Sequence, residues 1–209
     1  MQQENSKIRN YRTQECVVFS KTDGPFGGLS NMAPGYPLLI NGHLLANSEV
    51  LYQAMRYPLF PEIQEEIITQ HSPMTAKMIS KKYRNKTRQD WDELRVKIMR
   101  WSLEVKLSQN WEKFGELLRK TGDKQIVEYS TKDHFWGASE CGEGQLGGTN
   151  ALGRLLMDLR NKYAHTNLKP ECVAPPYITG FLLYGFEIET ICDEPYFSAD
   201  ASEHALIYA

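Results

Sequence analysis

The sequence predicts a helix-dominated α+β domain with a small sheet or hairpins at its N- and C-terminal sides. Residues 90–109 and 151–163 carry apolar side chains at three- and four-residue steps, the period of an amphipathic helix. The first 46 residues instead indicate short strands and turns. Residues 177–191 are rich in aromatic and β-branched side chains, which are typical of strands. Central helices between short terminal strands define the α+β class.

In the N-terminal half, residues 16–19 predict a strand that leads into the glycine turns of residues 23–28. Asn41-Gly42 separates two apolar triplets and indicates a tight hairpin over residues 38–45, because Asn and Gly readily adopt positive φ. Ser48 is the expected cap of a helix from residue 49 to about residue 57. Ser72-Pro73 predicts the start of the next helix, which runs to about residue 82.

In the C-terminal half, residues 90–109 form the longest predicted helix. A shorter helix is expected over residues 111–120, ending at Gly122, and a strand over residues 126–129. Asn150 is the expected cap of the last helix, residues 151–163. One or two strands are expected between residues 177 and 191.

The composition predicts one globular domain spanning residues 1–209, with 41% hydrophobic and 24% charged residues. No apolar run approaches the ~18–20 residues of a membrane helix, and the start of the chain lacks a signal-peptide pattern. We therefore expect a cytoplasmic protein without a membrane partner. The four cysteines form no CxxC pair, so we expect free thiols. These are Cys16, Cys141, Cys172 and Cys192.

The chain has few of the residue patterns that mark metal, cofactor or nucleic-acid sites. The net charge of −2 argues against a non-specific nucleic-acid coat, although residues 77–88 are rich in Lys and Arg. That run is either a local basic patch or a solvated helix end. The histidines show no metal-ligand spacing, so we expect neither a metal nor another cofactor. They are His43, His71, His134, His165 and His204.

A polar stripe begins at Glu49. Tyr52, Gln53 and Arg56 follow at three, four and seven positions, so all four share one face of the predicted helix. The stripe is either a solvent-facing helix side or part of a site. Glu49 lies in the first helical turn, where the helix dipole favours an ionised carboxylate. Such a group can stabilise an oxocarbenium-like ribose or activate water.

Two further candidates follow the strand at residues 126–129. Asp133 precedes Phe135 and Trp136, whose rings either stack a flat base or anchor the core, while Asp133 either approaches the sugar or makes a turn. The glycine-rich run of residues 137–150 then ends at a predicted helix start. Converging backbone N–H groups there would suit a phosphate, but a flexible surface loop has the same composition.

These segments occur in an order that resembles the NADAR (NAD and ADP-ribose) family, which includes riboflavin-biosynthesis intermediates N-glycosidases. The matching blocks are Phe26…Leu29-Ser30-Asn31, Ser48-Glu49-Val50-Leu51-Tyr52-Gln53-Ala54, Ser72-Pro73…Ala76-Lys77, Arg88-Gln89-Asp90-Trp91…Arg95…Met99, Thr121-Gly122, Val127-Glu128, Asp133-His134-Phe135-Trp136-Gly137 and Gly148-Thr149-Asn150-Ala151-Leu152-Gly153-Arg154-Leu155-Leu156-Met157…Leu159-Arg160. They cover residues 19–160, the expected family core, and leave residues 161–209 as an extension.

The resemblance implies hydrolysis of an N-glycosidic bond to a ribose that carries phosphate. It implies catalytic carboxylates at Glu49 and Asp133, and it adds Lys77 as a candidate nucleophile, since an amine can form a Schiff base at C1 of an opened ribose. A surface position on its helix is the alternative for Lys77. The implied substrate-binding residues are Phe26, Ser30, Asn31, Tyr52, Gln53, Trp91, Phe135 and Trp136, with Gly148, Asn150, Gly153 and Arg154 on the phosphate side.

Members of the family divide by substrate. Some act on phosphoribosylamino-pyrimidine intermediates of riboflavin synthesis, and others remove ADP-ribose from guanine, including antitoxins encoded with DNA ADP-ribosyltransferase toxins. This chain departs from the family at Val50, where histidine is common, and at Ser80-Lys81, where Gly-Arg is common. The loop over residues 137–150 and the C-terminal extension also enlarge the family core. These departures favour a larger substrate.

We therefore expect an N-glycosidase, a hydrolase that removes ADP-ribose from guanine in nucleic acid or a nucleotide. In the expected complex the base and ribose lie between Trp91 and Trp136. A cognate DNA ADP-ribosyltransferase toxin is the candidate protein partner of this antitoxin-type activity. One alternative is hydrolysis of the riboflavin intermediates. The other is a non-catalytic module that binds ADP-ribose or a nucleotide, or neutralises a toxin by binding.

Overall fold

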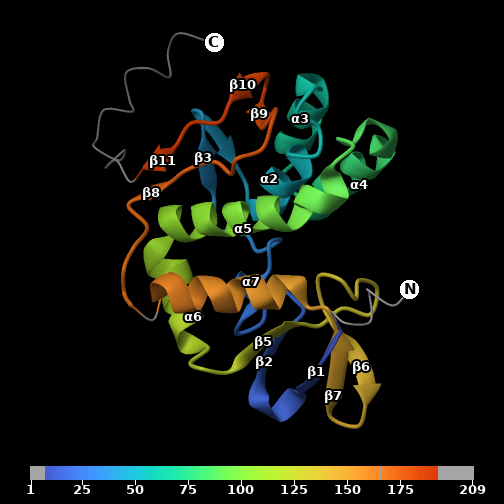
Figure 1. The fold of residues 1–209 in the computed structure, drawn as a ribbon, viewed down its shortest axis with the longest axis vertical. Coiled ribbons are helices and arrows are strands. Elements are labelled where there is room, and N and C mark those ends of the chain that lie inside the picture. Colours follow the sequence, from blue (N-terminus) through green and yellow to red (C-terminus); the bar gives the residue numbers. More distant parts are fainter. Residues whose placement is uncertain (1–7, 165, 193–209) are drawn as a thin grey trace.

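A computed structural model describes residues 8–164 and 166–192. The longest helix, α5 (Trp91–Gln109), crosses the middle of the molecule beside α7 (Ala151–Leu159) (Figure 1). Short helices and small strands lie on one side of this pair, and a small β layer lies on the other side. The predicted fold class, helix-dominated α+β with small sheets, is confirmed.

The other helices are short and lie mostly between residues 48 and 120. They are α2 (Ser48–Ala54), α3 (Pro61–Ile68), α4 (Pro73–Lys82) and α6 (Glu116–Lys120), with 3-10 turns η1 (Thr13–Glu15), η2 (Gly27–Leu29) and η3 (Arg84–Lys86) and wider π turns η4 (Trp111–Gly115) and η5 (Arg160–Ala164). None of the described helices is long and apolar enough to cross a membrane. Ser72 caps α4 as predicted, because its hydroxyl accepts the Thr75 N–H.

The strands form five small sheets. They are β1 (Arg9–Arg12), β2 (Cys16–Phe19), β3 (Leu38–Ile40), β4 (His43–Leu45), β5 (Gln125–Glu128), β6 (Ser139–Gly142), β7 (Gln145–Gly148), β8 (Cys172–Val173), β9 (Leu182–Leu183), β10 (Phe186–Glu187) and β11 (Ile191–Cys192). The predicted hairpin is confirmed, since β3 and β4 pair through a turn in which Asn41 and Gly42 both have positive φ. The late strands are also confirmed: β9 and β10 pair.

The parallel pair of β2 and β5 sets the position of the chain segment that ends at Glu128. Phe19 lies opposite Glu128 at the end of this pair, and β5 packs against α7. That packing is close because Gly153 has no side chain: a Cβ there would collide with the Ile126 carbonyl and the Asn150 side chain. Glycine at this position therefore serves the contact between helix and strand.

Three details of the predicted elements are wrong. Asn47, not Ser48, caps α2, because its Oδ1 accepts the Val50 N–H and Ser48 is already helical. Asn150 does not cap α7 with its side chain, which binds backbone groups of β5 instead. The glycine-rich run is not a loop but the hairpin β6–β7, which pairs with β1 into a three-stranded sheet.

The expectation of free thiols is wrong for one pair. Cys172 and Cys192 form a disulfide, because β8 and β11 pair with these two residues directly opposite each other. Cys16 and Cys141 are free. The extension predicted from residue 161 includes these strands, whereas residues 193–209, His165 and the start of the chain at residues 1–7 lie outside the described part.

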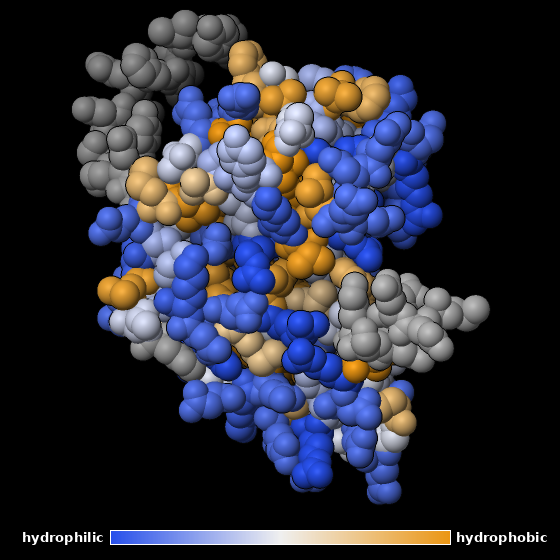
Figure 2. All heavy atoms as spheres, viewed as in Figure 1, coloured by the Kyte–Doolittle hydropathy of each residue, from blue (hydrophilic) through white to orange (hydrophobic). Residues whose placement is uncertain are grey.

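The core is continuous from the β2–β5 pair through α7 and α5 to α2 and α3. Trp101 and Phe181 pack edge to face within it, with ring centroids 5.0 Å apart. The exterior is mostly polar at the end of the molecule that carries the three-stranded sheet, as the lower part of Figure 2 shows. Since chain segments from both halves meet around α5 and α7, residues distant in sequence converge there.

Candidate active site

A pocket of about 160 Å³ brings together residues from six regions of the chain. Its lining residues come from the segment after η2, from α2, α4 and α5, from the end of β5 and the following turn, and from α7. They are Ser30, Asn31, Met32, Glu49, Tyr52, Gln53, Arg56, Lys77, Met99, Glu128, Ser130, Asp133, Trp136 and Leu152. Three carboxylates and one lysine therefore share a small pocket.

Glu49 begins the pocket wall that α2 supplies. The Asn31 carbonyl accepts its backbone N–H at 3.1 Å, and Gln53 Nε2 donates to its Oε1 at 2.8 Å. Glu49 is only 6% exposed, so the solvent-facing alternative for this stripe is wrong. All four residues of the stripe, including Tyr52 and Arg56, line the pocket.

The segment opposite Glu49 is fixed by a buried lysine on α5. Lys106 Nζ donates to the carbonyls of Gly28 and Ser30, at 2.6 and 3.0 Å, and lies over the ring of Tyr36. Burial and, to a smaller extent, the nearby charge of Lys113 lower the pKa of Lys106 to about 7. These bonds hold the chain that places Ser30 and Asn31 in the pocket wall.

Glu128 is the third carboxylate and is not among the site residues predicted from the sequence. Burial, together with the negative charges of Glu49 and Asp133, raises the pKa of Glu128 to about 7 against the opposing charge of Lys77. Its backbone N–H donates to Asn150 Oδ1 at 3.1 Å. The available signal was its place at the end of a strand, five residues before Asp133, in one of the matched family blocks.

Asp133 is both a turn residue and a pocket residue. Its Oδ1 accepts the backbone N–H groups of Phe135 and Trp136, at 3.1 and 2.9 Å. These bonds fix the carboxylate and orient the aromatic pair that follows. The turn therefore holds Asp133 at the pocket instead of competing with that role.

The aromatic wall differs from the expected one. The Tyr52 ring lies 4.9 Å from the Trp91 ring and 5.7 Å from the Trp136 ring, measured between centroids. Trp91 is buried behind Tyr52, so the expected slot between Trp91 and Trp136 is wrong. Phe135 packs on the Trp136 ring at 5.0 Å but does not line the pocket. Tyr52 and Trp136 are the aromatic residues that face the cavity.

The predicted phosphate cradle at the start of α7 is occupied by the protein itself. The N–H groups of residues 149–152 donate to the carbonyls of residues 134–137 at 2.8 to 3.1 Å. A helix N-terminus binds an anion only through free N–H groups, so this one is not available. Gly148, Asn150, Gly153 and Arg154 are not among the residues that line the pocket.

Asn150 and the two glycines have packing roles instead. Asn150 has positive φ, is fully buried, and bridges Ile126 and Glu128 of β5 through its amide. A Cβ on Gly148 would collide with the backbone of Gly137 and Ala138. These residues support the strand that carries Glu128, which gives them an indirect connection to the site.

Comparison with known proteins identifies the family of this chain. The NADAR domain matches residues 18–164 of the chain. The protein belongs to the NADAR family. The family assignment suggested by the ordered motifs is therefore confirmed.

Several named proteins are similar to this NADAR chain. "N-glycosidase YbiA" of Escherichia coli (strain K12) is 30% identical over 158 residues, which are 76% of this chain and 94% of that protein. "Riboflavin biosynthesis protein VVA0006" of Vibrio vulnificus is 31% identical over 185 residues, 86% of this chain, and the chain spans only 48% of that longer protein. The NMR structure of E. coli YbiA superposes with a TM-score of 0.63 at 31% identity, covering 74% of this chain and 88% of YbiA.

The two departures from the NADAR pattern lie away from the pocket surface. Val50 is fully buried in the core, and Ser80 is buried where its carbonyl accepts the Tyr57 hydroxyl. Neither residue lines the pocket. Their effect on the NADAR site is therefore through packing of α2 and α4.

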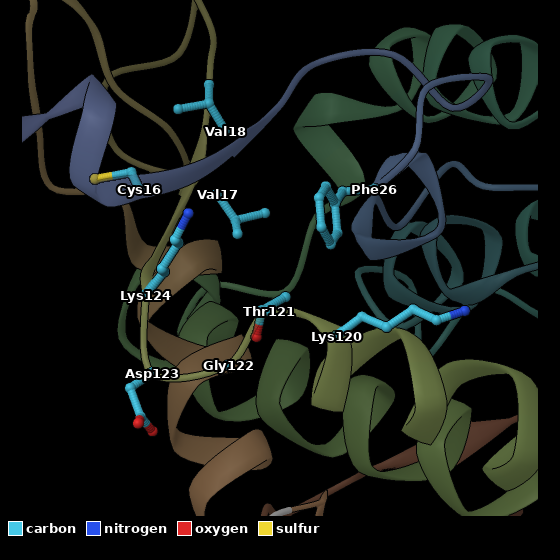
Figure 3. A pocket seen from close by; sticks show the side chains of 9 residues that line it. All are labelled: Cys16, Val17, Val18, Phe26, Lys120, Thr121, Gly122, Asp123 and Lys124. Atoms are coloured by element: carbon cyan, nitrogen blue, oxygen red, sulfur yellow. The ribbon is translucent and has the colours of Figure 1, made fainter.

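A second hollow of about 500 Å³ lies apart from the carboxylates of this NADAR protein (Figure 3). It is lined by β2 residues, by residues 120–124 and by Phe26. Its one acidic residue is Asp123, so the paired carboxylates that glycosidic cleavage needs are missing from its lining. Phe26, expected at the substrate, lies here and is not part of the carboxylate pocket. Among the described residues, no His, Cys, Asp and Glu cluster is placed to hold a metal ion.

Proposed function

We propose that this NADAR protein is an N-glycosidase that removes ADP-ribose from guanine bases in nucleic acid. The observation that carries the proposal is the pocket in which Glu49, Asp133 and Glu128 meet with Lys77. Glu128 has a pKa of about 7, so near neutral pH it holds its proton for a large fraction of the time. A protonated carboxyl beside ionisable ones is the arrangement used for glycoside cleavage.

In the proposed reaction, Glu128 donates its proton to the departing nitrogen of the base as the bond from that nitrogen to ribose C1 breaks. Glu49 and Asp133 stabilise the positive charge that develops on the ribose and activate the water that attacks C1. The water oxygen bonds to C1, and one of its protons passes to a carboxylate. Tyr52 and Trp136 supply the aromatic surface for the base.

Lys77 enters the proposal as an alternative attacking group. In this route the bond between C1 and the ring oxygen would open, the Lys77 amine would add to C1, and the base would leave C1 with the proton from Glu128. Water would then hydrolyse the resulting Schiff base, which releases the ribose and restores the amine. Lys77 lines the pocket and its charge acts on Glu128, which supports a role for it at the site. An ammonium at this position also offsets the repulsion among the three carboxylates.

Two features support a nucleic-acid substrate over a small free nucleotide. Two exposed basic residues follow Lys77 along the chain, Lys81 in α4 and Arg84 in η3, and neither has an ion-pair partner among the described residues. Such side chains suit a phosphate backbone that passes the pocket. The hairpin β6–β7 follows directly after the pocket turn and adds surface there.

The decisive experiment mixes the protein with DNA that carries ADP-ribosylated guanine and measures ADP-ribose release by chromatography and mass spectrometry. We expect release by the wild-type protein, and loss of release with retained ligand binding in Glu49→Gln. No release at high enzyme concentration would refute the proposal. If the protein protects cells against a DNA ADP-ribosyltransferase toxin and Glu49→Gln keeps this protection, the result would instead support a non-catalytic binding module.

A second candidate is hydrolysis of phosphoribosylamino-pyrimidine intermediates of riboflavin synthesis. The names of the relatives favour it, since one is a riboflavin biosynthesis protein. The same pocket chemistry serves both substrates, because each has a ribose bonded to a nitrogen and carrying phosphate. Turnover of the pyrimidine intermediate without turnover of ADP-ribosylated guanine would reverse the order of the two candidates.

A further inference from the structure

The phosphate of the proposed substrate needs donors other than the start of α7, whose N–H groups are already bonded. Buried donors without partners mark such sites, because native proteins satisfy nearly all buried polar groups. Six buried side-chain N or O atoms in the described residues lack a hydrogen-bond partner. Three of them are Tyr52 Oη, Arg56 Nε and Arg95 Nε.

Two of these groups belong to the carboxylate pocket, and the third, on Arg95, lies near them. Arg56 and Tyr52 line the pocket, and the Arg56 guanidinium lies over the rings of Trp91 and Tyr52, at 4.3 and 5.7 Å from their centroids. Arg95 extends from α5 over the Phe135 ring at 3.8 Å. The charges of both arginines act on the Tyr52 hydroxyl, so both cations lie near it.

The two guanidinium groups differ from other arginines of the chain. Arg100 pairs with Asp158 at 3.0 Å, and Arg88 pairs with Asp90 at 2.6 Å. Arg56 has no ion-pair partner among the described residues, and Arg95 has only Asp92, 3.8 Å away and 88% exposed. Stacking on aromatic rings holds both guanidinium groups in place while leaving N–H groups unpaired, as at an anion site.

We propose that Tyr52, Arg56 and Arg95 bind the phosphate of a phosphorylated ribosyl substrate. The assignment rests on the proposed function for the presence of a ribosyl group. Glu49 and Arg56 are seven residues apart, roughly 10 Å if measured as helix. Both side chains line the pocket, so a phosphate held by Arg56 can belong to the same substrate whose C1 reacts at Glu49. Guanidinium groups form paired hydrogen bonds with phosphate oxygens, and burial raises the pKa of the Tyr52 hydroxyl, so it stays a donor.

The test is calorimetric titration with three probes: D-ribose, ribose 5-phosphate and ADP-ribose. The wild-type protein should bind both phosphorylated probes at least tenfold more tightly than ribose. Arg56→Gln and Arg95→Gln should each weaken binding of a phosphorylated probe about tenfold or more, and Tyr52→Phe should weaken it less. Loss with both phosphorylated probes supports a monoester site, and loss with ADP-ribose alone supports a diphosphate site.

Arg100→Gln is the matched control, because Arg100 is on the same helix as Arg95 but pairs with Asp158. Its affinities should equal those of the wild-type protein. Arg56→Lys and Arg95→Lys keep the charge and should recover part of the loss, which tests the site if a glutamine variant does not fold. The proposal is overturned if neither phosphorylated probe binds more tightly than ribose, or if the arginine variants match the control.

These binding results are independent of turnover. Phosphate binding that depends on both arginines, without release of ADP-ribose from DNA, would leave this site intact and refute the proposed function. If the protein releases ADP-ribose but its arginine variants still bind the phosphorylated probes more tightly than ribose, the proposed function stands and this phosphate site is refuted.

Discussion

Replacing Glu128 with glutamine should change how the stability of the protein depends on pH. Burial and the charges of Glu49 and Asp133 raise the pKa of Glu128 from its ordinary value of 4.5 to about 7. Because each pH unit between those values corresponds to ~1.4 kcal/mol, the whole difference is worth about 3 kcal/mol of unfolding free energy.

The direction follows from which state holds the proton. Between pH 4.5 and about 7 the folded protein keeps the Glu128 proton while the unfolded chain loses it. The contribution of Glu128 to the free energy of unfolding is therefore fully present below pH 4.5 and is lost as pH rises through about 7. Glutamine does not titrate, so the unfolding free energy of the variant does not show this decrease.

Guanidinium unfolding followed by tryptophan fluorescence, at intervals from pH 4.5 to 8, measures the effect. The unfolding free energy of the wild-type protein minus that of Glu128→Gln should fall by about 3 kcal/mol across this range. Glu140→Gln, at an exposed position in β6, is the control and should follow the wild-type curve. Wild-type and Glu128→Gln curves that stay parallel would refute the buried, protonated state of Glu128.

The same variant tests the proposed acid. Glu128→Gln should lower kcat/KM on ADP-ribosylated guanine by about 10²–10⁴, the usual contribution of a general acid. Wild-type activity should decline as pH rises above about 7, since the proton is then lost. If Glu128→Gln keeps the wild-type kcat/KM and pH profile, another group must donate the proton to the departing base.

Three further changes test other parts of the structure. Lys77→Arg keeps a cation beside Glu128 but removes the nucleophilic amine, so turnover should fall at least tenfold. Treatment with substrate and cyanoborohydride should add mass to the wild-type protein alone. Unchanged turnover in the variant would restrict Lys77 to an electrostatic role. Gly153→Ala should destabilise the protein by about 1–3 kcal/mol in chemical unfolding, since the new Cβ collides with Ile126 and Asn150, and an unchanged midpoint would contradict that contact. Lys106 has a folded pKa of about 7, below its ordinary 10.5, so wild-type stability relative to Lys106→Met should rise from pH 7 to 10, and a constant difference would argue against its burial.

Local chemistry made part of the fold predictable. Asn41-Gly42 requires positive φ, Ser72-Pro73 starts a helix, and the periodicity of residues 90–109 defines α5. The errors arose where a local preference competed with a distant partner. Asn150 has the chemistry of a cap, but its amide binds β5, and the glycine-rich run has the composition of a loop, but it pairs with β1.

For the site, the sequence by itself determined the NADAR family, through the order of its motifs, and the shared face of Glu49, Tyr52, Gln53 and Arg56, because helical spacing is a local property. Only the tertiary structure decided which groups meet across elements. The β2–β5 pair and α7 bring Glu128 to the pocket with Glu49 and Asp133, and burial there shifts its pKa. Desolvation, charge coupling and the occupied N–H groups of α7 depend on neighbours far away in the chain, and no local pattern encodes them.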